Sequence, residues 1–427
     1  MQQTGKIEIE HLQVLMSKKQ NQTGPQSAFA SANGLQNRIE VLYDDVVSWR
    51  RHLHRNPELS FQEFDTTRWI VEKLEKWGYE VHRPCDTGCV AVLKGDRRDE
   101  NGTGNTVALR ADIDALPIQE EGEAKSEFLS EKDGVAHCCG HDLHTANLLG
   151  TALLLAEQKS AFSGKVVLIF QAGEEVLPGG GRLLAETGIL EELEVSEVYG
   201  LHTDPRHNPG QVAVKKGPMM ASPYEFTVEV RGKGGHAAAP HQAVDPIVIS
   251  AQIIQQLQTI VSRYTDPADA AVVTVSKINA GTARNIIPGY LMLEGTIRTF
   301  NEGQTKEIFD RIESICSHAA ASAGGSAKCE LITGYPPVIN HPETTEKFIN
   351  LAGDVLVSLE KQVMAGEDFS FYQKKIPGTF FLLGSGSDEA ASRYSWHHPR
   401  YNVDERCLKT GMRVMASLVL QDVAKNA

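Results

Sequence analysis

The chain has 427 residues, of which 41% are hydrophobic and 7% aromatic, and its formal net charge is -13 at pH 7. That length exceeds what one hydrophobic core usually serves, so we expect two domains of an ordinary α/β protein. The negative charge, without a basic stripe in the sequence, argues against a nucleic-acid partner and favours small molecules or peptides. No apolar run approaches the roughly 20 residues of a membrane span.

Cysteine usage and the N-terminus bear on the cellular compartment. The chain has seven cysteines, an odd number, and two of them, Cys138 and Cys139, are adjacent. This pattern suits reduced thiols or metal ligation better than paired disulfides, so we expect a cytoplasmic protein. Residues 1–34 lack the continuous apolar core of a signal peptide. We interpret them as an N-terminal extension whose composition allows disorder.

From Leu35 onward, helical and strand-like patterns alternate. Helical periodicity covers 35–53, 65–78 and 142–157. Short β-type runs cover 89–93, 106–110, 165–171 and 197–202. This alternation is typical of an α/β domain with a mostly parallel sheet and helices on both faces.

Polar side chains lie at or just past the ends of these predicted strands. They are Asp112, Asp114, Glu174, Glu175 and His202. Open α/β sheets build their sites at the carboxyl ends of the strands, so we expect these side chains to share one site.

A different pattern begins after Gly217. Strands are predicted over 222–232, 271–278, 290–299 and 328–332, with helices from Asp245-Pro246 to Tyr264 and over 302–321. The order β-α-β-β-α-β is that of a ferredoxin-like module. Because a strand over 379–383 and a final helix over 404–424 follow, we interpret 218–333 as an insertion into a larger domain made of 35–217 and 334–427.

The densest group of metal-binding side chains is the loop His137–His144. A two-metal hydrolytic site needs a bridging ligand, terminal ligands and a carboxylate base. Cys139 can bridge, and His141, His202, Glu175 and a late histidine can be terminal ligands. Glu174 is then free to act as the base. Adjacent glutamates on a strand point to opposite faces, so the strand must end in a turn, which the sequence after Glu175 supplies.

Other interpretations of these residues remain open at this point. The Glu174-Glu175 pair can be a solvated edge, and His202 can be a packed histidine. The run Gly179–Gly181 can suggest a phosphate loop, although no Gly-Lys-Ser/Thr follows it. Cys139 with His141 can be a thiol nucleophile and its base.

In combination, the motifs resemble those of the M20 metallopeptidase family, in its amidohydrolase branch of hippurate hydrolases, N-acyl-amino-acid deacylases and plant auxin-conjugate hydrolases. The matching segments are HRNPELS at 54–60, LRADIDALP at 109–117, CGHD at 139–142, QAGEE at 171–175, GLH at 200–202, GGHA at 234–237, NIIP at 285–288, GEDF at 366–369 and HHP at 397–399. They run in order from about Asn37 to Glu405.

The resemblance implies two divalent metal ions, zinc or manganese, with cobalt or nickel as further options. Cys139 would bridge them. His141 and His202 would hold one ion, and Glu175 and His397 the other.

It also implies roles for residues that are not ligands. Glu174 would be the general base, and His236, from the inserted lid domain and often from the partner subunit of a dimer, would stabilise the oxyanion. The resemblance thus implies a homodimer or a higher homo-oligomer. Asn285 would help to hold the substrate, and Asp114 would orient a ligand histidine. The resemblance does not assign Arg298. Because a guanidinium can hydrogen-bond two carboxylate oxygens, Arg298 is a candidate to bind a substrate carboxylate, and the equal alternative is an exposed arginine on a strand.

Several positions depart from the wider family or stay ambiguous. Many relatives have His-x-Asp where this chain has Asp112-Ile113-Asp114, so Asp112 is not assigned as a ligand. His397 and His398 compete for one role, and the spacing to Pro399 favours His397. Cys138 is interpreted as a packed thiol, and Glu367 as shaping the site or capping a helix.

The sequence therefore predicts a metal-dependent amidohydrolase, or aminoacylase, that cleaves N-acyl-L-amino acids of the hippurate or N-acetyl type to a carboxylate and a free amino acid. The alternatives within the family are an N-acetyl-diaminopimelate deacetylase and a dipeptidase or carboxypeptidase. A non-catalytic protein that keeps the metal loop is a further alternative.

Overall fold

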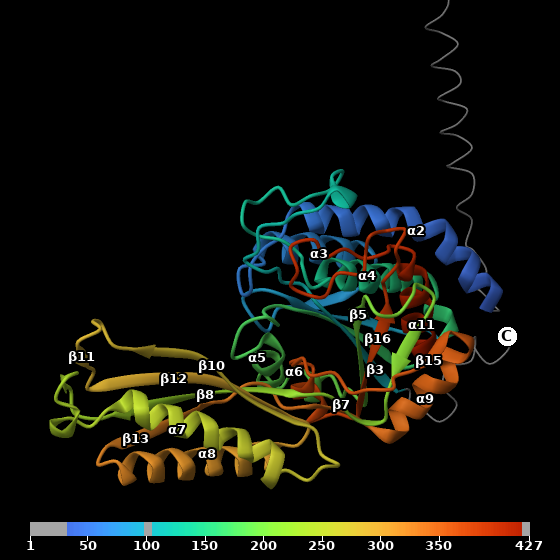
Figure 1. Ribbon diagram of the computed structural model, residues 1–427. Coiled ribbons are helices and arrows are strands. Elements are labelled where there is room, and N and C mark those ends of the chain that lie inside the picture. The colour runs from blue at the N-terminus through green and yellow to red at the C-terminus, as the bar shows by residue number, and fades with distance from the viewer. Residues whose placement is uncertain (1–31, 98–104, 421–427) are drawn as a thin grey trace, which may run out of the picture.

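The computed structural model describes residues 32–97 and 105–420 (Figure 1). Of the predicted N-terminal extension, 1–31 lie outside the described residues. The remaining three residues already belong to helix α2 (Ala32–Arg55), so this helix begins earlier than its periodicity predicted.

The larger sheet has eight strands. In spatial order they are β1 (Glu80–His82), β2 (Cys89–Lys94), β4 (Lys165–Gln171), β3 (Thr106–Asp112), β5 (Glu197–Asp204), β16 (Gly378–Gly384), β6 (Val212–Val214) and β15 (Leu356–Ser358). The central pairs β4/β3, β3/β5 and β5/β16 are parallel. Towards one edge, β2 runs antiparallel to β4 and β1 antiparallel to β2, and towards the other edge β6 runs antiparallel to β16. The mainly parallel sheet is therefore confirmed at its centre.

Helices cover both faces of this sheet (Figure 1). One face packs against α2, α3 (Phe64–Lys76), α4 (His141–Glu157), α9 (Pro342–Ala352) and α11 (Cys407–Val419). The other packs against α5 (Gly180–Glu186), α6 (Ile189–Glu192) and α10 (Ser370–Gln373). Side chains of successive strand residues point to opposite faces of the sheet: Leu109 packs on the first face and Ala108 on the second. Burial on both faces explains why the interior of β4, residues 166–170, is a continuous apolar run.

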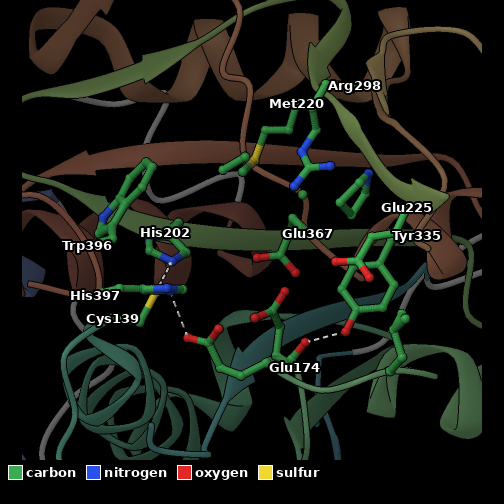
Figure 2. A pocket seen from close by; sticks show the side chains of 15 residues that line it. Cys139, Glu174, His202, Met220, Glu225, Arg298, Tyr335, Glu367, Trp396 and His397 are labelled. Atoms are coloured by element: carbon green, nitrogen blue, oxygen red, sulfur yellow. Dashed lines mark hydrogen bonds and ion pairs between the residues drawn. The ribbon is translucent and has the colours of Figure 1, made fainter. Parts of the chain in front are cut away.

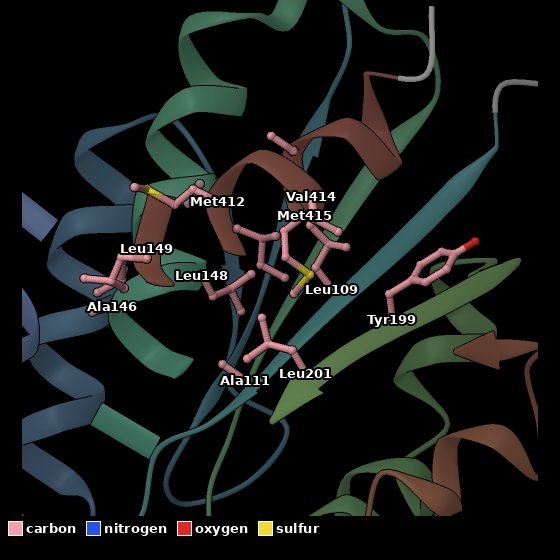
Figure 3. Close-up of a cluster of buried hydrophobic side chains, with 14 of the residues drawn as sticks. Leu109, Ala111, Ala146, Leu148, Leu149, Tyr199, Leu201, Met412, Val414 and Met415 are labelled. Atoms are coloured by element: carbon pink, nitrogen blue, oxygen red, sulfur yellow. The ribbon is translucent and has the colours of Figure 1, made fainter. Parts of the chain in front are cut away.

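The core on the first face fixes the position of α4. In Figure 3, Leu109 and Leu201 from adjacent strands meet Leu148 of α4 and Met415 of α11. Almost the whole of α4 is buried. A helix that is buried all round cannot shift towards solvent without exposing apolar surface, so its N-terminus is held firmly at the carboxyl ends of the central strands.

The second sheet contains four strands, all paired antiparallel, in the order β10 (Ala271–Ala280), β12 (Tyr290–Thr299), β8 (Ser222–Arg231) and β13 (Ser326–Ile332). Helices α7 (Pro246–Thr259) and α8 (Glu302–Ser322) pack on one of its faces (Figure 1). The predicted cap of α7 is present, because the Asp245 side chain accepts a hydrogen bond from the Ile247 amide at 2.9 Å.

Two small ribbons complete the strands. They are β7 (Gly217–Met220) with β14 (Val338–Asn340), and β9 (Gly235–His236) with β11 (Ile286–Ile287). The final helix α11 begins at Cys407, whereas periodicity placed its start at 404, and the predicted end at 424 lies outside the described residues. In the ranges that the structure describes, no helix is both long and apolar enough to cross a membrane.

Candidate metal centre and active site

Most of the predicted site residues lie where the larger sheet meets the smaller one. A pocket of about 470 Å³ opens there. Its lining residues are Cys139, Glu174, Glu175, Leu177, His202, Met220, Pro223, Glu225, Arg298, Tyr335, Ala365, Gly366, Glu367, Trp396 and His397. Figure 2 shows the histidines and Cys139 on one side of this pocket and Arg298 on another.

Two groups of candidate ligands share the Cys139 thiol. Within each group the ligand atoms lie no more than 4.8 Å from one another. One group is Cys139 with His141 and His202, and the other is Cys139 with Glu175 and His397. The structure thus brings together all five residues that the sequence predicted as ligands. His141 also belongs to a group with Glu174 and Glu175 and to another with Asp112 and His144.

The hydrogen bonds of the two buried histidines leave one nitrogen of each for the site. His202 places Nδ1 at 2.8 Å from the Thr203 carbonyl oxygen and Nε2 at 3.3 Å from the Cys139 sulfur. His141 donates through Nδ1 to Asp114. Its Nε2 is buried, and no hydrogen-bond partner exists for it in the described part of the chain. A neutral imidazole that donates through Nδ1 presents a lone pair on Nε2, which is the form that binds a metal.

The charge of the site also fits a cation. Burial and the carboxylates of Glu175 and Glu174 raise the pKa of the Cys139 thiol well above its ordinary value. Burial and the charges of Glu367 and Glu175 likewise raise the pKa of Glu174. Buried acids that repel one another are stabilised in their ionised forms by a divalent cation, so the donor set of thiol, imidazole and carboxylate fits a metal centre.

Gly140 sets the geometry of the metal loop. It has φ +99° and stands immediately before α4, so Cys139 lies outside the helix and His141 is its first residue. A Cβ on Gly140 would come within 2.5 Å of Thr203 Oγ1 and 2.9 Å of Tyr401 Oη. Both the left-handed backbone and the close approach require glycine here.

Asp114 connects the two ligand groups. Its Oδ1 lies 3.0 Å from His141 Nδ1, and its Oδ2 accepts hydrogen bonds from the Glu175 amide at 3.0 Å and the Ser60 hydroxyl at 2.7 Å. One fully buried carboxylate therefore fixes both the ring of His141 and the backbone of Glu175. In this position Asp114 can orient a ligand histidine, which is the role that was predicted for it.

Asp112, left out of the predicted ligand set, is occupied by other partners. Its Oδ1 lies 2.6 Å from His144 Nδ1 and its Oδ2 accepts from Arg110 at 2.7 Å. His144 in turn accepts a hydrogen bond from the Thr203 amide at 2.9 Å through Nε2. Both nitrogens of His144 are thus used inside the protein, and this histidine supports the strand end that carries His202.

The two late histidines differ in their position relative to the pocket. His397 lines the pocket, with Nε2 at 3.3 Å from Glu175 Oε1, and its backbone has φ +64°. The ring of His398 stacks on Tyr394 at 4.5 Å and its Nδ1 accepts from the Arg400 amide. His398 is not among the residues that line the pocket.

Arg298 reaches the same pocket from the smaller sheet. It lies on β12, and its Nη1 donates to the carbonyl oxygens of Tyr224 and Ile297 at 3.3 and 3.2 Å. Burial lowers the pKa of Arg298, and the nearby Glu225 opposes that shift. A half-buried guanidinium at the pocket wall is suited to an anionic group of a ligand.

Two predicted residues lie away from the pocket in this chain. His236 and Asn285 are exposed, and they are neighbours, because β9 pairs with β11 and the Ala237 amide donates to the Asn285 carbonyl oxygen. Their ribbon is beyond the Tyr290 end of β12, eight residues from Arg298. At about 3.3 Å per residue, that separation is roughly 26 Å along the strand.

Sequence reasoning missed several pocket residues. Tyr335 donates from its hydroxyl to the Glu174 carbonyl oxygen at 2.6 Å, and the Trp396 indole donates to the Thr203 carbonyl oxygen at 2.8 Å. Trp396 adjoins the predicted ligand His397, which was an available signal. Tyr335 had none, since its partner lies 161 positions away.

The glycine-rich run after Glu175 does not act as a phosphate loop within the chain. The Gly181 amide donates to Asp368 Oδ2 at 2.7 Å, so an internal carboxylate takes the place that a phosphate oxygen would need. Cys138 is fully buried and is absent from the candidate ligand groups, as the prediction of a packed thiol requires.

Comparison with known proteins identifies the family. The model of peptidase family M20/M25/M40 matches residues 108–421. The chain belongs to this family. It is therefore a hydrolase that acts on amide bonds, and the predicted M20 resemblance is confirmed.

Similar proteins cover nearly all of the chain. It is 37% identical to thermostable carboxypeptidase 2 of Saccharolobus solfataricus, over 91% of this chain and 98% of that protein. It is 42% identical to an N-acyl-L-amino acid amidohydrolase of Geobacillus stearothermophilus, over 71% of this chain and 80% of that protein. The crystal structure of a dinuclear metal-binding M20 peptidase of Bacillus subtilis has a TM-score of 0.76 and 34% identity, over 91% of this chain and all of the other.

Proposed function

We propose that this protein is a metal-dependent amidohydrolase that cleaves N-acyl-L-amino acids to a carboxylate and a free amino acid. The observation that carries the proposal is the pair of ligand groups sharing Cys139, set beside Glu174 in a pocket that also contains a guanidinium. The similarity to the Geobacillus N-acyl-L-amino acid amidohydrolase supports this choice of substrate.

The metal centre would contain two divalent ions. Cys139 would bridge them, with His141 and His202 on one ion and Glu175 and His397 on the other. Thiolate and imidazole favour zinc, while the carboxylate also admits manganese, cobalt or nickel. When bound, such ions polarise a carbonyl group and make a coordinated water more acidic.

Glu174 performs the proton transfers in this proposal. Its carboxylate takes a proton from the attacking water as the water oxygen bonds to the amide carbon. It then passes that proton to the nitrogen as the carbon–nitrogen bond breaks. Arg298 holds the substrate carboxylate, Asn285 assists in binding, and His236 donates a hydrogen bond to the tetrahedral oxyanion.

The smaller sheet would be an inserted ferredoxin-like lid over 218–333. Its order β8-α7-β10-β12-α8-β13 follows the βαββαβ pattern, and its hydrophobic cluster is drawn from residues of this segment. The catalytic domain would consist of 35–217 and 334–427.

A homodimer would complete the site. His236 of one chain is too far from its own pocket, so a second copy would supply it. Strand β10 is an edge strand of its sheet and exposes Ile278, which favours pairing with another chain.

The protein would be cytoplasmic. All of its cysteines are unpaired, which supports this location.

Mixing two inactive variants tests the base and the dimer together. The Glu174→Gln and His236→Ala variants should each be inactive. When the two variants are co-expressed and purified together, the mixture should have about a quarter of wild-type activity. The reason is that half of the dimers would be mixed, and one of their two sites would be intact. No recovery, in a mixture shown to contain mixed dimers, would place His236 in its own chain's site. Full activity of Glu174→Gln would refute the role of Glu174 as the general base.

Peptide hydrolysis is the second candidate function, because a relative of 37% identity is a carboxypeptidase. An N-blocked dipeptide and the matching N-acetyl amino acid, compared by kcat/KM, distinguish the two. The N-acetyl-diaminopimelate deacetylase alternative is tested with that substrate in the same assay.

A further inference from the structure

Glu367 is a pocket residue without a settled role in the function proposed above. It precedes α10, is 1% exposed, and lines the pocket. Its carboxylate faces that of Glu174 across the pocket (Figure 2). One oxygen of each of Glu174, Glu367 and Asp368 lies within 4.8 Å of the others.

The protein anchors Glu367 through one oxygen. Glu367 Oε1 lies 3.1 Å from Nη2 of the buried Arg110 and accepts a hydrogen bond from the Phe369 amide at 3.0 Å. The other oxygen, Oε2, accepts no hydrogen bond from the residues that the structure describes. A buried carboxylate is expected to use both oxygens, so Oε2 is available for a ligand in the pocket.

The spacing of the two carboxylates suits a single nitrogen atom between them. Hydrogen bonds from N–H to oxygen are about 2.9 Å long, so two acceptors no more than 4.8 Å apart can both contact one nitrogen. In the proposed reaction, Glu174 delivers a proton to the departing nitrogen and must therefore be within reach of it. The same nitrogen can then reach Glu367.

We propose that Glu367 contacts the substrate directly: its Oε2 accepts a hydrogen bond from the N–H of the scissile amide and holds the amine as it leaves. This inference rests on the proposed function. It restricts the substrates to N-acyl amino acids with a secondary amide, since N-acylproline and N-methylated analogues have no N–H to donate.

The reaction increases the number of donors that face Glu367. Water gives its oxygen to the amide carbon and a proton to Glu174, the carbon–nitrogen bond breaks, and that proton moves to the nitrogen. The nitrogen thus leaves as an amine with one more N–H than the amide had. When the new carboxylic acid ionises, its proton makes the amine an ammonium group with three donors. Oε2 therefore binds the product nitrogen more strongly than the substrate nitrogen, and free amino acid should inhibit through this contact.

An ester substrate separates this contact from a merely structural role. We would measure kcat/KM for N-acetylalanine and for the ester O-acetyl-lactate, in wild type, Glu367→Gln and Glu367→Ala. The alanine variant should lose about 10- to 100-fold on the amide and less than about threefold on the ester, which has no N–H. Inhibition by free alanine should weaken in the same variant. Glu225→Gln removes another carboxylate from the pocket wall and should leave the amide-to-ester ratio unchanged.

Several outcomes would overturn the inference. Equal losses on amide and ester would mean that Glu367 acts only through the fold, which thermal unfolding of both variants would confirm. Wild-type turnover of N-acetyl-N-methylalanine or N-acetylproline as fast as N-acetylalanine would remove the predicted N–H contact. A wild type that hydrolyses no N-acyl amino acid refutes the proposed function instead, and the two failures are thus distinguished.

Discussion

Asparagine at position 114 offers a quantitative test of the metal centre. In the native protein, Asp114 offers only acceptors, to His141 on one side and to the Glu175 amide and Ser60 hydroxyl on the other. The amide of Asp114→Asn is nearly isosteric but brings an NH₂ group. In one orientation the NH₂ group points at the Glu175 amide N–H, and in the other it points at the N–H of His141 Nδ1. In either case two donors face each other, so one native hydrogen bond is replaced by a repulsive contact.

The second orientation has a specific chemical effect. To accept from the new NH₂ group, His141 Nδ1 must lose its proton, and the neutral ring then carries the proton on Nε2. That nitrogen is the one that lies 3.8 Å from Glu175 Oε1. Loss of an orienting carboxylate behind a ligand histidine lowers metal affinity by about 10- to 100-fold, or about 1.4 to 2.7 kcal/mol.

Competition with a chromophoric chelator measures this affinity without relying on turnover. Ser60→Ala is the matched control, because it removes one hydrogen bond from Asp114 and leaves the carboxylate intact. We expect the control to remain within a few fold of wild type. Zinc or manganese affinity of folded Asp114→Asn within about twofold of wild type would refute the role given to Asp114.

Three further predictions follow from the pocket and its surroundings. Arg298→Ala should raise KM for an N-acyl amino acid by about 10- to 100-fold with a smaller effect on kcat, and Arg298→Lys should recover only part, as steady-state kinetics would reveal. His397→Ala should lose one equivalent of bound metal by elemental analysis, whereas His398→Ala should retain both; the reverse result would exchange their roles. Although burial opposes it, the hydrogen bond from His54 lowers the pKa of Glu120 to about 2. Its ionised form therefore stabilises the fold above about pH 4.5, and this stabilisation is lost as pH falls towards 2. Glu120→Gln should be less stable at pH 7, and its free energy of unfolding in urea should depend less on pH between pH 5 and 3 than that of wild type. An unchanged pH dependence would contradict this.

Local patterns were sufficient to predict the central strands and the metal loop. Strand β4 was predicted with its observed bounds because both of its faces are buried and its sequence is one apolar run. The three-residue strands β6 and β15 were missed, since so short a segment has no periodicity. β6 pairs with β16, and β15 pairs in turn with β6, so both depend on partners distant in sequence. The candidate ligands could be identified because residues with thiol, imidazole and carboxylate side chains occur together in a few short motifs.

Residues defined by tertiary partners could not be predicted in the same way. Arg110 is an arginine inside an apolar strand, which signals a buried ion pair, but its partners Asp368 and Glu367 come from over 250 positions away. Glu367 was therefore left between two interpretations. His236 and Asn285 were brought together by the β9/β11 ribbon, yet their distance from the pocket depends on the length of β12, which a motif does not encode.

Release of free amino acid from N-acetyl, N-benzoyl and longer N-acyl amino acids, before and after chelation and again after restoring zinc or manganese, tests the central claim most directly. We predict release from some members of this panel, loss of release with the chelator, and recovery with metal. Hydrolysis that persists in the metal-free protein and is abolished by thiol alkylation would contradict the account, because it would make Cys139 a nucleophile rather than a ligand.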